Sequence, residues 1–312
     1  MQDIKLLESE NFQVLKDLGH GTSGIVFLAH RQEVGLVAAK VVSNSKFDKV
    51  EWDAAGILNK DPPETCPYIV RNILAKQFEK STVILLEYAN LGTLYDLIQT
   101  GNEIPLTVIR TIMKQLLTGL NYIHSKGIIH RDIKGGNIML HSPLGSGRVN
   151  CKIADFGVVK IKKDLQQSTL LSFAGTPAYM APEVFITGGI QKGTGDYEVD
   201  VWSLGMLLFI LNEVLIRPAS IQDDTLWNLL TLMLSFDRKN RISIAQIFEH
   251  PFFTSEYAMT EISVKQRKLA QSAQIAQQNG DLNITSFDMD PSYIFPFKEL
   301  KKIHDRNKPE IE

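Results

Sequence analysis

The sequence predicts an α+β fold in which a small, β-rich lobe precedes a larger helical lobe. Before residue 88, strand-like runs alternate with Gly and polar residues, a pattern typical of an antiparallel sheet. From Leu91 onward, apolar residues recur at steps of three and four, which indicates helices. The chain has 312 residues, 44% of them hydrophobic, which suffices for a sizeable core and exceeds the fraction found in disordered chains.

The β-rich lobe is expected over residues 12–86. Its strand candidates are the runs FQVLKDL, GIVFLAH, GLVAAKVV and TVILLEY. One helix candidate, residues 46–60, interrupts them. A connection over residues 87–92 would then lead into the second lobe.

The helical lobe is expected over residues 93–254. The run PLTVIRTIMKQLLTGLNYIHSKG begins with Pro105 near its first turn and ends at Gly127, as helices commonly do. The run LGMLLFILNEVLI from Leu204 is apolar on every side, which predicts a helix buried in a large core. It is too short to cross a bilayer.

Residues 255–312 form a C-terminal tail of different character. A polar helix is expected up to Asn279 and Gly280, and the remainder mixes aromatic with charged residues. The tail either packs partly on the preceding domain or serves as an element that docks a partner.

Charge and cysteine content restrict the partners and the compartment. The net charge is −2, from 33 basic and 35 acidic side chains, which argues against general binding to nucleic acid or to anionic membranes. Cys66 and Cys151 lie far apart with no partner at ligand spacing, so they are expected to be reduced core thiols. The first residues lack the apolar core of a signal peptide. A cytoplasmic location is therefore expected.

The stretch GHGTSGIV, residues 19–26, is rich in glycine and joins two strand candidates. A dinucleotide-binding fingerprint would instead lead from a strand into a helix. Glycines without a Cβ let backbone N–H groups approach phosphates closely. They also build ordinary hairpins, so the stretch alone leaves both interpretations open.

Lys40 lies among apolar residues in the third strand candidate. A buried lysine is costly unless it finds a negative partner, which here is either a phosphate or a carboxylate of the following helix. Glu51 shares its helix face with Ala54, Ala55 and Leu58 at steps of three, four and seven, and is better placed than Asp53. The alternative is a Glu51 that faces solvent.

The stretch HRDIKGGN brings a carboxylate, an ammonium group and an amide together: Asp132, Lys134 and Asn137. They form either a solvated turn or a catalytic loop that handles phosphate and metal. Carboxylate and amide oxygens are hard ligands that suit Mg²⁺.

Taken together, the motifs resemble those of the eukaryotic protein kinases. They occur in the family's order over about residues 12–254: GHGTSGIV, VAAK, HRDIKGGN, DFG at 155–157, GTPAYMAPE at 175–183 and DVWSLG at 200–205. Lys134, two residues after Asp132, is typical of serine/threonine kinases. The resemblance implies a bilobal protein kinase-like fold and an ATP- and Mg²⁺-dependent serine/threonine kinase acting on proteins. Two alternatives are a pseudokinase-like scaffold without phosphotransfer and a kinase for small molecules.

The resemblance also implies roles for individual residues. Asp132 would orient the substrate hydroxyl, Lys134 would neutralise the γ-phosphate, and Lys40, paired with Glu51, would hold the α- and β-phosphates. Asn137 and Asp155 would bind Mg²⁺. The implied nucleotide-binding residues are Gly19, His20, Gly21, Thr22, Ser23, Gly24, Val26, Ala38, Lys40, Glu51, Leu86, Glu87, Ala89 and Met139.

Within that set, the apolar residues would enclose the adenine. Val26 and Ala38 would form its roof and Met139 its floor, while Leu86 would occupy the gatekeeper position. The Glu87 carbonyl and the Ala89 backbone would bind the purine edge.

Other residues that match the family's motifs would have structural roles. His130 would pack near Phe156, and Thr176 would bridge Asp132 and Lys134. Glu183 and Arg241 would form a buried ion pair, and Asp200 would hold the backbone of the catalytic loop. His124 is interpreted only as the end of its helix.

A switch is expected in the segment after the DFG motif. Its hydroxyl residues Ser168, Thr169 and Ser172 could take a phosphate from an upstream kinase or by autophosphorylation, and the spacing favours Ser172. Such a phosphate could bind Arg131, together with Lys160 or Lys162. Alternatively, these hydroxyls are plain solvent-exposed loop residues.

The chain departs from the family pattern between Trp202 and Arg241, which is shorter than usual and puts substrate docking in doubt. We expect the aromatic residues Phe287, Tyr293, Phe295 and Phe297 of the tail to pack back on the helical lobe and cover surface exposed there.

Overall fold

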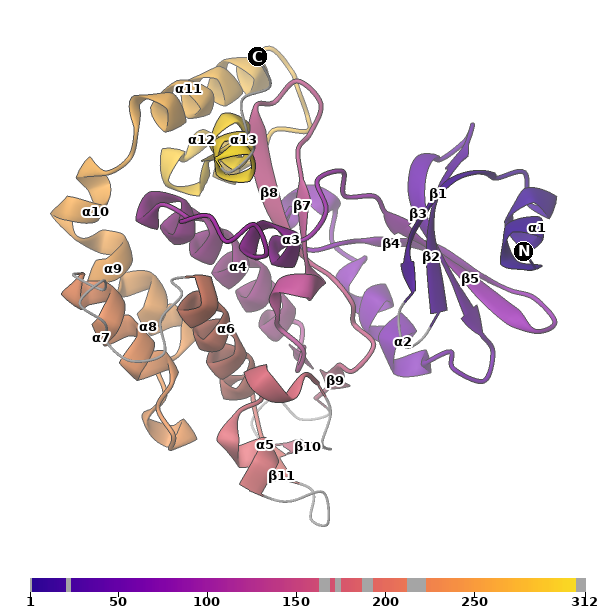
Figure 1. Ribbon diagram of the computed structural model, residues 1–312, viewed down its shortest axis with the longest axis horizontal. Coiled ribbons are helices and arrows are strands. Elements are labelled where there is room, and N and C mark those ends of the chain that lie inside the picture. Colours follow the sequence, from indigo (N-terminus) through magenta and orange to yellow (C-terminus); the bar gives the residue numbers. More distant parts are fainter. Residues whose placement is uncertain are drawn as a thin grey trace.

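The computed structural model describes residues 2–20, 24–162, 169–171, 175–186, 193–211 and 223–306. A five-stranded antiparallel sheet forms one lobe, and helices form most of the other (Figure 1). The predicted α+β class, with the β-rich lobe first, is confirmed.

The sheet of the first lobe has the order β1-β2-β3-β5-β4. Its strands are β1 (Gln13–His20), β2 (Gly24–Arg31), β3 (Gly35–Ser43), β4 (Asn72–Gln77) and β5 (Ser81–Glu87). Four of them correspond to the predicted runs. The edge strand β4 was not predicted, because its residues NILAKQ carry no regular alternation.

Two helices accompany this sheet. The helix α2 (Lys49–Leu58) lies within the predicted range, and the Asp48 carboxylate caps its N-terminus by accepting a 2.7 Å hydrogen bond from the Val50 N–H. The helix α1 (Gln2–Ser9) was not predicted. Leu7 of α1 is completely buried against Phe27 and other residues of the outer sheet face, so this helix covers the face opposite Lys40.

The second lobe is built around α4 (Leu106–Ser125), the helix that the apolar spacing predicts. Further helices of this lobe are α3 (Leu94–Ile98), α5 (Pro182–Ile186), α6 (Glu198–Leu211), α7 (Asp224–Met233), α8 (Ile244–Glu249) and α9 (Pro251–Thr254). Of these, α6, α8 and α9 pack on α4. Most residues of α6 are buried, which confirms the predicted core helix as far as Leu211; residues 212–216 of the predicted run lie outside the described residues.

Short strands and 3₁₀ turns lie between the longer elements of the chain. The strand pairs are β6 (Ile128–Ile129) with β9 (Lys160–Ile161), β7 (Ile138–His141) with β8 (Arg148–Ile153), and β10 (Thr169–Leu171) with β11 (Gly193–Gly195). The 3₁₀ turns are η1 (Pro63–Thr65), η2 (Gly135–Asn137), η3 (Pro177–Tyr179) and η4 (Arg238–Asn240).

The tail continues the helical lobe. Its elements are α10 (Glu256–Thr260), α11 (Val264–Gln278), α12 (Ser286–Met289), η5 (Pro291–Tyr293), β12 (Phe295–Pro296) and α13 (Phe297–Asp305). The polar helix predicted before Gly280 is confirmed as α11. After its cap Asn279, Gly280 turns the chain with φ +91°, a conformation that favours glycine.

The tail packs back on the helical lobe, as predicted, but its aromatic residues do not lie where they were expected. Phe287 and Tyr293 contact Tyr68, and Phe295 pairs with Val149 on the edge of β8. The expected place was the shortened stretch between Trp202 and Arg241. The tail packs on the edge of β8 because β12 pairs with backbone groups of that strand and Phe295 becomes completely buried there.

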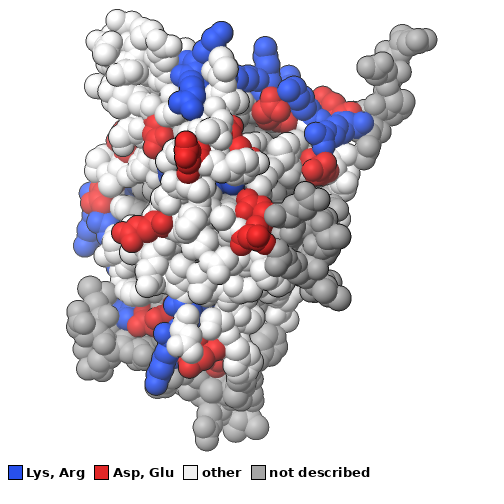
Figure 2. Space-filling model, turned by 90° about the vertical axis from the view of Figure 1, so that its left-hand side faces the viewer, with Lys and Arg blue, Asp and Glu red and all other residues white. Residues whose placement is uncertain are grey.

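The surface carries charge of both signs. On the face turned to the viewer in Figure 2, Lys and Arg gather toward the end where α11 and α13 lie, with Asp and Glu among them. Within the described residues, the structure contains no helix with both the length and the apolar character needed to cross a membrane.

Candidate active site

The inner face of the sheet carries the predicted ion pair between Lys40 and Glu51. The Lys40 Nζ lies 2.9 Å from Glu51 Oε1, and both residues are buried. Asp53 instead pairs with Lys49 at 2.8 Å on the surface. The helical spacing that favoured Glu51 over Asp53 therefore identified the right partner.

The apolar residues predicted around the adenine lie on the same sheet face as Lys40. In the antiparallel register Val26 is opposite Lys40 and Ala38 is opposite Leu86, and Ala38 and Lys40 are two apart on one strand. Residues opposite or two apart share a face. Met139 lies on β7 of the second lobe and bridges to Thr93, just beyond the connection. Glu87 and Ala89 lie at the start of that connection.

The glycine-rich stretch is described only at its two ends. Gly19, the residue before the last one of β1, has φ +151°, and the Asp17 carboxylate accepts hydrogen bonds from the Gly19 N–H and from the His20 ring, both at 2.9 Å. Gly24 begins β2. The predicted residues Gly21, Thr22 and Ser23 lie outside the described residues.

The catalytic-loop candidates form one closed hydrogen-bond network. Lys134 Nζ donates to Asp132 Oδ2 at 2.8 Å and to Thr176 Oγ1 at 2.7 Å, and Thr176 donates to Asp132 Oδ1 at 2.8 Å. Asn137 Nδ2 donates to both the carbonyl oxygen and Oδ2 of Asp132 at 2.9 Å. The predicted bridge by Thr176 is confirmed.

This network keeps Asp132 ionised. Burial alone would raise the pKa of Asp132, but the hydrogen bonds from Lys134, Thr176 and Asn137 outweigh burial and lower that pKa below its ordinary value. A carboxylate anchored through both oxygens has a fixed orientation, which is what a group that receives or aligns a hydroxyl proton needs.

A glycine places Thr176 within this network. Gly175 has φ +112°, and a Cβ there would collide with the carbonyl oxygen of Arg131. Only glycine allows this approach of the two loops. The sequence GTP therefore brings its Thr to the catalytic loop because of the residue that precedes it.

The backbone of the catalytic loop is held by a buried carboxylate from α6. Asp200 is completely buried, and its two oxygens accept hydrogen bonds from the N–H groups of His130 at 2.8 Å and Arg131 at 2.7 Å. Arg131 has φ +69°, an uncommon conformation for a non-glycine residue. Asp200 thus holds the backbone of the catalytic loop, as predicted, and its hydrogen bonds compensate for the strain at Arg131.

His124 was expected only to end its helix, but its side chain also contacts the buried carboxylate of Asp200. Its Nε2 lies 2.8 Å from Asp200 Oδ2, and its ring packs on Tyr197. Although burial opposes ionisation, the hydrogen bond from His124 and the nearby His130 lower the pKa of Asp200. Spacing along α4 could not reveal this contact, because Asp200 is 76 residues away.

His130 is structural, as predicted. It is completely buried, its ring lies edge-on to Phe156 with centroids 5.2 Å apart, and Nε2 lies 3.2 Å from the Ala154 carbonyl oxygen. Burial lowers the pKa of His130, which favours the neutral ring. Because the ring is also shielded from solvent, it is not placed to act as a general base.

Asp155 lies between the two lobes at φ +64°, with its Oδ1 3.9 Å from Lys40 Nζ. Its side chain is half exposed, so its oxygens are accessible. Within the described residues, no cluster of three or more His, Cys, Asp or Glu side chains could hold a metal ion alone. Any divalent ion here would thus take further ligands from phosphate or water, as Mg²⁺ commonly does.

The predicted ion pair between Glu183 and Arg241 is also present. The guanidinium group binds both carboxylate oxygens, at 2.7 and 2.9 Å, and also donates to the carbonyl oxygens of Glu198 and Ser235. The Arg241 side chain is completely buried. This pair fixes the segment that follows Thr176 to the core.

Comparison with known proteins identifies the class: the chain belongs to the family described as "Protein kinase domain", whose match covers residues 12–253. Among individual relatives, "Serine/threonine-protein kinase 10" of Homo sapiens is 33% identical over 81% of this chain, and its counterpart in Danio rerio is 30% identical over 94%. "CBL-interacting serine/threonine-protein kinase 13" of Arabidopsis thaliana is 29% identical over 83%. The chain spans 28%, 32% and 54% of these three proteins, respectively. Membership in this family implies the use of ATP with a divalent metal ion.

Proposed function

We propose that the protein is a serine/threonine kinase that transfers the γ-phosphate of ATP to hydroxyl groups of protein substrates. The observation that carries this proposal is the closed network of Asp132, Lys134, Thr176 and Asn137. The Lys40–Glu51 pair accompanies it, with Lys40 Nζ 3.9 Å from Asp155 Oδ1. The names of the relatives agree with it.

In this mechanism, positioning and charge stabilisation do most of the work. The ionised Asp132 accepts a hydrogen bond from the substrate hydroxyl and aligns its oxygen. Lys134, only two residues away, supplies positive charge where negative charge develops on the transferred phosphoryl oxygens. Lys40, held by Glu51, binds the phosphates that remain on the nucleotide.

The metal is proposed to be Mg²⁺, held by Asn137 and Asp155. The donor set fits, because Asp155 offers accessible carboxylate oxygens and the amide nitrogen of Asn137 is engaged by Asp132. The amide oxygen of Asn137 is then the atom available as a hard ligand. When bound, Mg²⁺ neutralises phosphate charge; the residues of the chain fix where it can bind.

One assay separates this proposal from its two rivals. The full chain is incubated with ATP, Mg²⁺ and a generic basic protein, and the phosphorylated residues are identified by mass spectrometry. Phosphoserine or phosphothreonine on the protein supports the proposal. Nucleotide binding without transfer would instead indicate a pseudokinase-like scaffold, and transfer only to small molecules would indicate a kinase of that class.

Regulation is proposed to act through Ser172, by an upstream kinase or by autophosphorylation. Ser172 lies outside the described residues, so the support is its spacing before Gly175 and the presence in the chain of three candidate cations, Arg131, Lys160 and Lys162. Of these, Lys162 already pairs with Asp196, at 2.6 Å. Arg131, whose guanidinium group donates to the carbonyl oxygens of Val158 and Val159, is the proposed phosphate ligand, together with Lys160.

Replacing Ser172 tests the switch. Ser172→Ala is expected to lower activity by about tenfold or more, because charge-assisted hydrogen bonds to the phosphate are lost. Thr169→Ala is the matched control and should retain activity. Full activity of unphosphorylated wild-type protein would exclude the switch but not the kinase assignment.

The proposed location is the cytoplasm. Its support is the pair of buried, unpaired thiols, Cys66 and Cys151, since unpaired thiols persist in reducing compartments. Microscopy of the tagged chain in cells tests the location directly.

A further inference from the structure

The C-terminal segment, residues 285–305, is tied to β8, the strand that leads to Asp155. Gln115 on α4 makes the first connection: its Nε2 donates to the carbonyl oxygens of Tyr293 at 2.7 Å and Val149 at 3.2 Å. Its Oε1 accepts a 2.8 Å hydrogen bond from the Cys151 N–H. One buried side chain thus joins the segment to two residues of β8.

Two further contacts strengthen this connection. The strand β12 adds to the edge of β8, with Phe295 opposite Val149. Arg148, the first residue of β8, forms a buried ion pair with Asp288 at 3.1 Å. Asp288 also accepts 2.8 Å hydrogen bonds from the backbone N–H and the hydroxyl of Thr285, so its position is fixed by the start of α12.

Aromatic rings extend the contact to the far end of β8. Tyr293 stacks on Tyr68 with centroids 6.1 Å apart and an interplanar angle of 10°, and Phe287 contacts the same ring at 5.4 Å. Phe287 and Tyr293 also contact each other at 5.2 Å. Tyr68 is 2% exposed, so these rings make up much of its surroundings.

Tyr68 in turn fixes the last residue of β8. Its carbonyl oxygen accepts a 2.9 Å hydrogen bond from the Ile153 N–H, and the Ile153 carbonyl accepts one from the Val70 N–H at 2.8 Å. Gly119 of α4 packs against this point, since a Cβ there would lie 2.9 Å from the Tyr68 carbonyl oxygen. Asp155 follows Ile153 by two residues.

We infer that Tyr293 and Phe287 are positioning residues for Asp155: through Tyr68 they hold the end of β8 and thereby the metal-binding carboxylate. This inference rests on the proposed function of Asp155. It gives the C-terminal segment a part in nucleotide and metal binding, although the segment lies beyond the 12–253 match to the kinase family.

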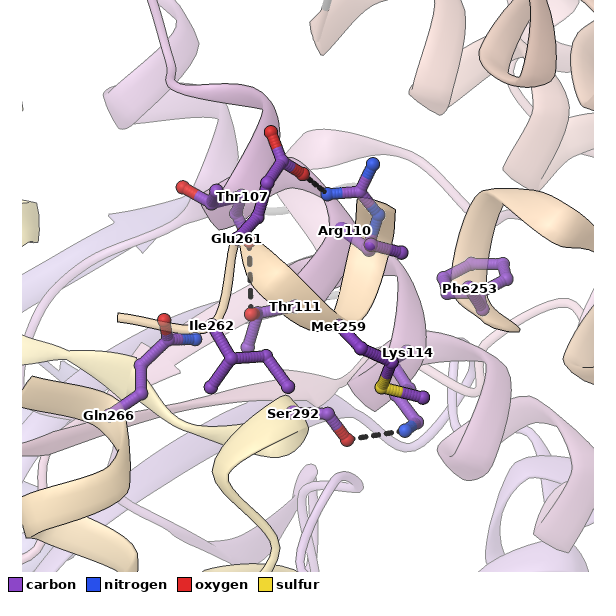
Figure 3. Close-up of a pocket in the computed structure, with 11 residues that line it drawn as sticks. Thr107, Arg110, Thr111, Lys114, Phe253, Met259, Glu261, Ile262, Gln266 and Ser292 are labelled. Carbon is purple, nitrogen blue, oxygen red and sulfur yellow. Dashed lines mark hydrogen bonds and ion pairs between the residues drawn. The ribbon is translucent and has the colours of Figure 1, made fainter. Parts of the chain in front are cut away.

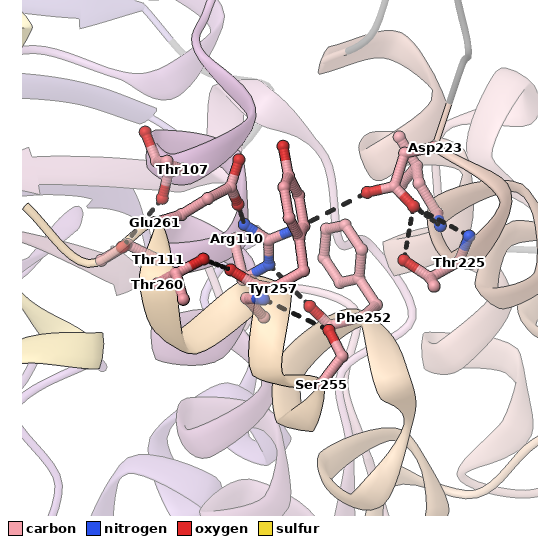
Figure 4. A network of polar contacts seen from close by, with 12 residues as sticks. Thr107, Arg110, Thr111, Asp223, Thr225, Phe252, Ser255, Tyr257, Thr260 and Glu261 are labelled. Atoms are coloured by element: carbon pink, nitrogen blue, oxygen red, sulfur yellow. Dashed lines mark hydrogen bonds and ion pairs between the residues drawn. The ribbon is translucent and has the colours of Figure 1, made fainter.

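The rival explanation is that Tyr293 and Phe287 only stabilise the fold. A second contact between the tail and α4 serves as the control. Arg110 of α4 binds Glu261, lies 3.8 Å from Asp223 and donates to the Phe252 carbonyl oxygen at 2.6 Å (Figure 4). These contacts also anchor the tail to α4 but do not involve β8. The nearby pocket in Figure 3, of about 20 Å³, has room for one water molecule.

The test compares Tyr293→Ala with Glu261→Gln in the full chain. The free Mg²⁺ concentration that half-saturates binding of a fluorescent ATP analogue is measured, together with amide hydrogen exchange of residues 150–158. Tyr293→Ala is expected to raise the Mg²⁺ requirement by about threefold to tenfold and to accelerate exchange at Ile153 and Ala154. Tyr293→Phe keeps the ring and should restore wild-type behaviour.

Glu261→Gln should lower the melting temperature without changing either readout. If Tyr293→Ala does not fold, Tyr293→Leu keeps apolar volume without the stacked ring and serves instead. The inference is overturned if Tyr293→Ala and Glu261→Gln change exchange at Ile153 equally, or if neither changes it. Hydrogen exchange requires no phosphotransfer, so a wild-type protein that fails to phosphorylate would refute the proposed function separately.

Discussion

Individual catalytic candidates depend on contacts that fix their charge and direction. Asp132 has both oxygens occupied by Lys134, Thr176 and Asn137, so a change at any of these alters a preorganised group. Preorganised charge is usually the largest contribution to such catalysis. Removing the carboxylate should therefore impair chemistry far more than binding.

Asp132→Asn is expected to lower kcat by about 10²- to 10⁴-fold while nucleotide affinity stays near that of the wild type, because the amide cannot align the hydroxyl proton. Steady-state kinetics and a nucleotide-binding titration check both parts. Asp155→Ala provides the contrast, since it should weaken binding of the Mg²⁺–nucleotide complex itself. Near-normal turnover of Asp132→Asn would contradict the assigned mechanism.

At this scale, helical spacing predicted the partner of Lys40, and the resemblance to the kinase family predicted the other contacts of the site. Lys40, Glu51, Asp132, Thr176 and Asp200 all make the contacts that were expected. His124, Gln115 and Tyr68 were missed, because each acts on a residue distant in sequence and occurs in an ordinary helix or loop. Only the tertiary structure gives these three a partner.

Among the elements, buried polar links hold the helices around the site. The Glu183–Arg241 pair joins α5 to the stretch before α8, with the Arg241 side chain completely buried. A buried ion pair is not strongly stabilising compared with an apolar replacement, but breaking it leaves an unpaired charge. The single variant Arg241→Met and the double variant Glu183→Gln, Arg241→Met should therefore differ in their free energy of unfolding.

Arg241→Met should lower the free energy of unfolding by about 3–5 kcal/mol, because the Glu183 carboxylate loses its partner. Urea unfolding of the purified variants measures this change. The double variant Glu183→Gln, Arg241→Met should recover part of the loss, since no buried charge remains. A single variant as stable as the wild type would show that solvent or another group replaces the guanidinium.

Elements with a clear sequence pattern, whether alternating, periodic or uniformly apolar or polar, were predicted well, and those defined by their neighbours were not. The helices α4, α6 and α11 and four strands of the sheet follow their patterns. The helix α1 and the strand β4 were missed, since α1 is short and β4 needs β5 to satisfy its backbone. Likewise, β12 consists of two residues that are a strand only because β8 lies beside them.

For the whole molecule, the kinase domain and the tail share one hydrophobic core. Phe295, Leu300 and Ile303 are at most 2% exposed and belong to the same cluster as Ile112 and Leu116 of α4. The sequence led us to expect the tail to cover the surface exposed by the shortened stretch between Trp202 and Arg241. The structure instead makes the tail part of the folding unit.

Phe295→Ala is expected to lower the free energy of unfolding by about 3–5 kcal/mol, because a fully buried ring leaves a cavity. The melting temperature should fall by about 10 °C, as differential scanning calorimetry would show. Leu282→Ala is the control within the tail, since Leu282 is 86% exposed. Truncation after Ser255 removes all three core residues and should prevent stable folding; a truncated chain that melts like the wild type would contradict a shared core.

The pH dependence of stability also belongs to the whole molecule, because several histidines are buried without charge. Burial lowers the pKa of His130, although Asp200, Asp155 and Asp132 oppose that change, and burial likewise lowers the pKa values of His141 and His250. In the unfolded chain these rings take up protons near pH 6.5. Below that pH the unfolded state binds protons that the folded state does not, so the free energy of unfolding falls as the solution is acidified.

His130 alone should contribute a slope of at most about 1.4 kcal/mol per pH unit below pH 6.5. The carboxylates act at lower pH: the pKa values of Asp132 and Asp200 are depressed, so their contribution is present above about pH 4 and is lost only below it. Urea midpoints are measured at intervals between about pH 5 and pH 8, where only the histidine effect operates. His130→Phe keeps a ring against Phe156 but cannot titrate, so its midpoint should depend less on pH; equal slopes for wild type and variant would show that His130 is not the group responsible.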